Sequence, residues 1–138
     1  MNIDKFKAQH VEILSEIKSL RELSLHGIES HSAEIAALLA SMSRTISSHL
    51  ATEDLVLYPV LREDKSAKIA AMSSAYQEEM KGIATAYIKF SRHWNQVTLA
   101  ADPQKFRDEA NIVLKMVHSR IVKENTQFYP AIESLPGA

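Results

Sequence analysis

Apolar residues recur at steps of three and four along four long stretches of this chain, as they do on one face of an α-helix. The first stretch shows this spacing with Ile3, Phe6, Ile13, Ile17 and Leu20. No stretch alternates with a period of two over enough residues to predict a strand. The pattern therefore predicts four helices, near residues 2–25, 31–62, 66–100 and 103–132.

Short breaks separate the predicted helices. Gly27 is a suitable stop for the first helix, and the polar run 64–67 separates the second from the third. Asp102 and Pro103 form the clearest boundary, because an N-cap candidate is followed by proline at the first helical position. Long helices with short connections are typical of an up-down-up-down bundle. We therefore predict that residues 1–138 form one all-α four-helix bundle.

Composition removes several classes of function. The 138 residues include no cysteine, which excludes disulfides, thiolate metal sites and cysteine nucleophiles. The net charge of −1 gives no basic field that would favour nucleic acid or an anionic membrane. The first residues lack the apolar segment of a signal peptide. These features predict a cytoplasmic protein without nucleic-acid or membrane partners.

Several charged or polar residues interrupt the apolar faces of the predicted helices. An unpaired carboxylate inside a bundle costs several kcal/mol, so several of them at one height need a cation. The interrupting residues are His10, His49, Glu53, Glu79, His118 and Glu124.

His49 and Glu53 form the most informative pair. Residues four apart on a helix differ by about 40° in azimuth and about 6 Å in height, so both side chains point the same way. Imidazole and carboxylate without thiolate suit iron, manganese or zinc. Four-helix bundles that take such ligands from all of their helices house di-iron sites.

The ends of the second and fourth predicted helices resemble one another. In each, a glutamate precedes a Tyr-Pro pair by five positions: Glu53 before Tyr58-Pro59, and Glu124 before Tyr129-Pro130. Each proline lacks an N–H, so we expect a kink or an early stop there. The repeat, with a period of about 71 residues, suggests two similar helix pairs related by a pseudo-twofold axis.

The pattern of His10, His49-x-x-x-Glu53, Tyr58-Pro59, Glu124 and Tyr129-Pro130 resembles the hemerythrin/HHE cation-binding family. The resemblance extends over almost the whole chain. It implies a four-helix bundle with a non-heme di-iron centre. Members of the family carry or sense oxygen, act on nitric oxide, react with peroxide, or supply iron for repair.

The second half of the chain departs from the family pattern. Gln77-Glu78-Glu79-Met80 stands where a histidine of the third helix is expected, and Arg120 occupies the position four before Glu124 where the family has histidine. Aligning Ile83 with Ile13 places Met80 opposite His10. His118 lies six residues before Glu124, about 120° away on a regular helix, an offset that a π-bulge would correct.

Two interpretations of this half follow. In one, Glu79 or Glu78 replaces the missing histidine and His118 reaches the metal, which gives a carboxylate-rich site of His10, His49, Glu53, Glu79, His118 and Glu124. In the other, Arg120 pairs with Glu124 or Glu79, and its guanidinium takes the place of one cation. The site then holds one metal ion or none.

The sequence thus favours a non-heme iron protein, with one or two ions, that binds or senses O2, NO or a related small oxidant and is not an enzyme. An interaction module with a lost or single metal, and a labile iron store or carrier, are the alternatives. We expect a monomer or a homodimer, because small residues form a second face on the third predicted helix: Ala71, Ala75, Gly82 and Ala86.

Overall fold

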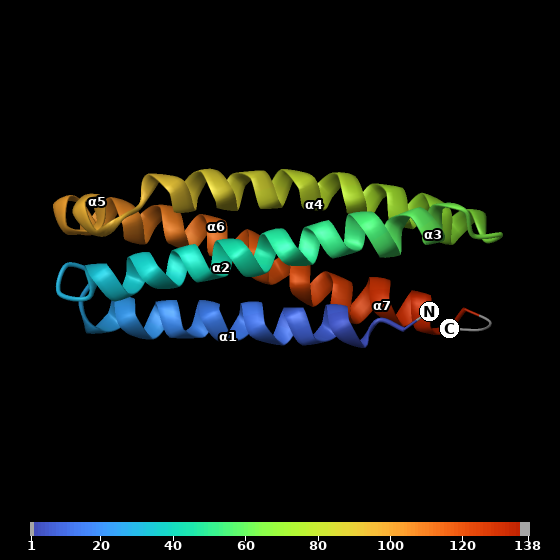
Figure 1. Ribbon diagram of the computed structural model, residues 1–138, viewed down its shortest axis with the longest axis horizontal. Coiled ribbons are helices and arrows are strands. Elements are labelled where there is room, and N and C mark those ends of the chain that lie inside the picture. Colours follow the sequence, from blue (N-terminus) through green and yellow to red (C-terminus); the bar gives the residue numbers. More distant parts are fainter. Residues whose placement is uncertain (1, 136–138) are drawn as a thin grey trace.

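The computed structural model describes residues 2–135, and its helices run back and forth along one long axis (Figure 1). The elements in chain order are α1 (Asp4–His26), α2 (Ser32–Thr52), η1 (Glu53–Leu57), α3 (Tyr58–Arg62), α4 (Ala67–His93), α5 (Gln96–Ala101), α6 (Pro103–Lys123), η2 (Glu124–Phe128) and α7 (Tyr129–Glu133). The two η elements are single π-helical turns that join their neighbours without a break. The described residues contain no strand, and the predicted all-α bundle is confirmed.

Two of the predicted breaks have the expected chemistry. Gly27 ends α1 with φ 119°, a conformation in which a side chain would be strained. At the start of α6, the Asp102 carboxylate accepts the Lys105 N–H at 3.2 Å, and Pro103 fills the first helical position. Local chain chemistry therefore sets both boundaries.

The prediction of one continuous helix over 66–100 is wrong, because the helix is interrupted between α4 and α5. The Asn95 side chain accepts the N–H groups of Val97 and Thr98 at 2.9 and 3.0 Å, and Thr98 Oγ1 accepts the Asn95 N–H at 2.8 Å. This reciprocal capping box begins a new helix. The apolar pattern hid the break, because Trp94 and Leu99 on either side are both buried.

The prolines of the two repeats change the helices in the same way. Pro59 and Pro130 have no N–H to donate, and the backbone pairing widens just before each of them. Tyr58 N–H donates to the Glu53 carbonyl, and Tyr129 N–H donates to the Glu124 carbonyl, five residues back in each case. The expected kink or stop is thus a π turn through which each helix continues.

The apolar core consists of two clusters that meet end to end. The larger one lies toward the Gly27 turn and α5 and includes Ile13, Ile46 and Ile121. The smaller one lies toward the chain ends and includes Phe6 and Phe128. Figure 1 shows the start of α1 and helix α7 at that end of the bundle. Along their own helices, His10, His49, Glu53 and Glu124 fall between the two clusters, whereas His118 lies between Val117 and Ile121 of the larger one.

None of the helices over residues 2–135 is long and apolar enough to cross a membrane.

The α5 cap yields a stability prediction. Replacing Asn95 by alanine removes two hydrogen bonds to backbone N–H groups at the helix start, so Asn95→Ala should lower the free energy of unfolding by about 1 kcal/mol. Urea unfolding followed by circular dichroism measures this change. The neighbouring exposed Gln96 provides the control variant, Gln96→Ala. Equal stability of the two variants would contradict the assigned cap.

Candidate metal centre

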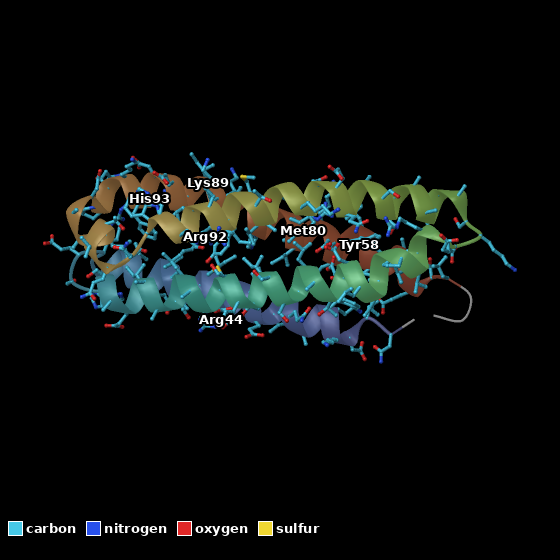
Figure 2. The ribbon with its side chains drawn as sticks, turned by 45° about the horizontal axis from the view of Figure 1, so that its top comes forward. Arg44, Tyr58, Met80, Lys89, Arg92 and His93 are labelled. Carbon is cyan, nitrogen blue, oxygen red and sulfur yellow. The ribbon has the colours of Figure 1, made fainter. Side chains whose placement is uncertain are left out.

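Four side chains from four elements meet inside the bundle. His10 comes from α1, His49 from α2, Glu53 from η1 and Glu124 from η2. One ligand atom from each lies within 4.8 Å of the others, and all four residues are at most 1% exposed. Tyr58 and Met80 are also buried and lie between the helices rather than at the outer margin of the molecule (Figure 2).

The donor atoms of the cluster converge on a small space. His49 Nε2 lies 2.5 Å from Glu53 Oε1, and His10 Nε2 lies 3.0 Å from Glu124 Oε1. The two Nε2 atoms are themselves 3.2 Å apart, and His49 Nε2 is 3.9 Å from Glu124 Oε1. Two imidazole nitrogens and two carboxylates therefore face one another.

Amide oxygens fix the direction of both imidazole rings. His10 Nδ1 lies 2.8 Å from Asn125 Oδ1, and His49 Nδ1 lies 2.7 Å from Gln9 Oε1. Because an amide oxygen only accepts, each Nδ1 carries the hydrogen, and Nε2 of the neutral ring presents a lone pair to the cluster. Histidines that bind metal ions are oriented in this way.

Two buried carboxylate oxygens of the cluster lack a hydrogen-bond partner in the part of the chain that the structure describes. Oε2 of Glu53 and Oε2 of Glu124 are buried and find no hydrogen-bond partner within residues 2–135. A buried carboxylate oxygen without a partner is costly, and a cation between the donors would offset that cost. Two imidazoles and two carboxylates are a donor set that iron, manganese or zinc accepts. The residues present therefore fit one metal ion.

The charges of the cluster shift the pKa values of its members. Burial alone would lower the pKa of His49, but contacts with Glu124 and Glu53 outweigh burial and raise it to about 9. Burial alone would raise the pKa of Glu124, but the imidazoles of His10 and His49 and the Arg120 guanidinium lower it. Without a metal ion, His49 thus carries a proton at neutral pH, and this proton supplies part of the positive charge that the carboxylates require.

Tyr129, which in the sequence stands out only as part of the repeat, is a further member of the site. Its hydroxyl donates to Glu53 Oε1 at 3.1 Å and lies 3.2 Å from His10 Nε2. Its ring stacks on the His10 imidazole at 5.0 Å between centroids. Burial and the charge of Glu53 raise the pKa of Tyr129, so the phenol remains a neutral donor. In the sequence, only the Tyr-Pro repeat could have pointed to Tyr129. For Gln9 and Asn125, the only indication was that each stands next to a candidate ligand.

Glu79 and His118 lie outside the cluster, contrary to the first interpretation of the sequence. The Glu79 side chain is 49% exposed and pairs with Arg120 at 3.1 Å and with Lys123 at 3.4 Å. His118 is partly exposed on α6. The π turn begins at Glu124 itself, so the helix between His118 and Glu124 is regular and keeps the offset of about 120° between them.

Arg120 points inward, as the second interpretation expects. It is 2% exposed, and its Nε lies 3.7 Å from Glu124 Oε2. Nη1 pairs with Glu79 Oε1 at 3.1 Å, and Nη2 donates to the Tyr76 carbonyl at 2.6 Å. The guanidinium carbon also lies 4.1 Å from the centre of the Tyr76 ring. Arg120 is thus a fixed cation beside the cluster.

Comparison with known proteins identifies one family. The model of the hemerythrin HHE cation binding domain matches residues 1–132, nearly the whole chain. No curated protein and no solved structure matches the chain.

The ligand set leads to a prediction about metal content. Each of the variants His49→Ala and Glu53→Ala removes one donor atom from the converging group, so each should retain at least about tenfold less metal than the unchanged protein. Metal analysis after loading and gel filtration measures the difference. His26→Ala is the control, because His26 is exposed at the end of α1. Full metal content in either variant would show that the ligand assignment is wrong.

Loss of an amide that orients an imidazole should weaken metal binding less than loss of a ligand does. Gln9→Ala removes the acceptor of His49 Nδ1–H and leaves all four donor atoms in place, so it should weaken metal binding by about 10- to 100-fold. Competition with a chromophoric chelator measures the affinity. Gln104→Ala is the matched control, because that exposed glutamine contacts Asp108 far along α6 from η2. An affinity equal to that of the control would contradict an orienting role for Gln9.

Proposed function

Because the chain belongs to the hemerythrin HHE cation-binding family, we propose that it is a non-heme iron protein that binds O2, NO or a related small oxidant. The observation that carries the proposal is the convergence of two oriented imidazole nitrogens and two buried carboxylates on one small space. His10, His49, Glu53 and Glu124 would hold the ion. Among the metals that accept these donors, the family resemblance favours iron.

Each of the four residues is enclosed by apolar side chains one helical turn away. Toward the larger core cluster these are Ile13, Ile46 and Ile121, and toward the smaller one Phe6, Leu57 and Phe128. All six are at most 3% exposed. They exclude bulk water from the donor atoms, which strengthens electrostatic interactions there and favours a small uncharged ligand over a hydrated ion.

The polar neighbours of the site prepare it for a cation. Gln9 and Asn125 hold both Nε2 lone pairs toward the centre, and the Tyr129 hydroxyl holds one oxygen of Glu53. When bound, iron would supply a redox-active centre with a coordination position for the small ligand. Because the protein groups are oriented beforehand, they need little rearrangement when the ion binds.

Reconstitution tests this function. Protein loaded with ferrous iron under anaerobic conditions should retain metal after gel filtration, and addition of NO or O2 should change its visible spectrum. The metal-free and zinc-loaded proteins should show no such change, because neither contains a redox-active ion. Failure to retain iron would contradict iron binding. Retained iron with a spectrum insensitive to both gases would contradict the proposed ligand class alone.

A further inference from the structure

The two halves of the chain share a partial repeat and matching π turns, but they differ at the site. Shifting by 71 residues places Glu53 on Glu124 and Tyr58 on Tyr129, and both glutamates begin a π turn. The same shift places His49 on Arg120. One half therefore has an imidazole where the other has a guanidinium.

The remaining helices of the two halves, α1 and α4, repeat in the same manner. A shift of 70 residues places four of the five buried positions of α1 on buried positions of α4: for example, Phe6 falls on Tyr76 and Ile17 on Tyr87. His10 then falls on Met80, which is 3% exposed. The first half thus provides two imidazoles and a carboxylate, whereas the second provides a thioether, a guanidinium and a carboxylate.

Glu124 is shared between the two halves. Its Oε1 lies 3.0 Å from His10 Nε2 on the imidazole side, and its Oε2 lies 3.7 Å from Arg120 Nε on the other. The carboxylate therefore faces the candidate ion with one oxygen and a permanent cation with the other. An arginine side chain in a protein is in effect always protonated.

Arg120 is held in this place by contacts from α4. Glu79 pairs with Nη1, the Tyr76 carbonyl accepts from Nη2, and the Tyr76 ring lies under the guanidinium. Lys123 in turn pairs with Glu79. A second divalent ion on this side would meet a fixed positive charge. The residue that corresponds to His10 there is Met80, whose sulfur is a soft ligand poorly suited to iron.

We propose that Arg120 is a built-in cation that replaces a second metal ion, so that the site binds one ion per chain. This inference rests on the proposed function for the first ion, which His10, His49, Glu53 and Glu124 would hold. It adds that the positive charge of the second half-site comes from the protein itself. Glu79, although it is no ligand, is then a positioning residue for Arg120.

Counting bound ions tests the inference. Anaerobic titration with Co2+, followed by absorption and by equilibrium dialysis, should give one ion per chain for the unchanged protein. The double variant Met80→His/Arg120→His places imidazoles at both repeat-related positions and should bind two. Arg44→His is the control, because it adds a histidine at an exposed position of α2 and should leave the count at one.

The possible outcomes separate the two proposals. Two ions in the unchanged protein, or one ion in a folded double variant, would overturn the role of Arg120 and leave the proposed function intact. No bound ion in the unchanged protein would overturn both.

A measurement on the metal-free protein gives an independent result if the double variant does not fold. Arg120→Ala should lower the urea midpoint of unfolding, because Glu124 loses its nearest permanent cation, whereas Arg120→Lys should recover part of the loss. An Arg120→Ala midpoint equal to that of the unchanged protein would overturn the inference.

Discussion

Two carboxylates buried side by side with two imidazoles are the constraint on which the rest of this bundle depends. Glu53 and Glu124 are inaccessible to water. Burial of their negative charge without compensation would cost a large part of the free energy of unfolding of a small domain. Positive charge must therefore be close at hand. A proton on His49, the Arg120 guanidinium and a bound metal ion can each supply it.

The architecture keeps this polar group at one height. The two apolar clusters lie on either side of it, and the π turns carry both glutamates at equivalent places in the two helix pairs. The prolines that follow remove a backbone donor in each helix, so the irregular pairing falls at the same point of both repeats. The two apolar clusters stabilise the fold, and the polar layer between them contains the candidate metal ligands.

The internal repeat shows which residues of the second half correspond to the histidines of the first half. A symmetric arrangement would offer equivalent donors to two ions, but here His10 and His49 have Met80 and Arg120 as their counterparts. The fold thus has two related half-sites, of which one presents imidazole and carboxylate donors that fit a cation and the other contains the Arg120 guanidinium. Glu124 belongs to both, which couples the charge of the arginine to that of the metal position.

The sequence alone determined the four-helix plan and the Gly27 and Asp102-Pro103 boundaries. Of the six site residues that it predicted, four meet in the cluster, and Glu79 and His118 do not. Periodic apolar faces reveal any polar residue placed on them, which is why His10, His49, Glu53 and Glu124 could be identified. The sequence missed the break before α5, because local capping hydrogen bonds end a helix without altering its apolar spacing.

Only the tertiary structure decided between His118 and Arg120. Both stand near the edge of the apolar face of α6, where the direction of a long side chain depends on its neighbours. Contacts with the carbonyl and ring of Tyr76 and with Glu79 hold the Arg120 side chain inside the bundle. His118, by contrast, lies about 120° from Glu124 around the regular helix. These contacts join residues more than 40 positions apart, and no local pattern in the sequence records them.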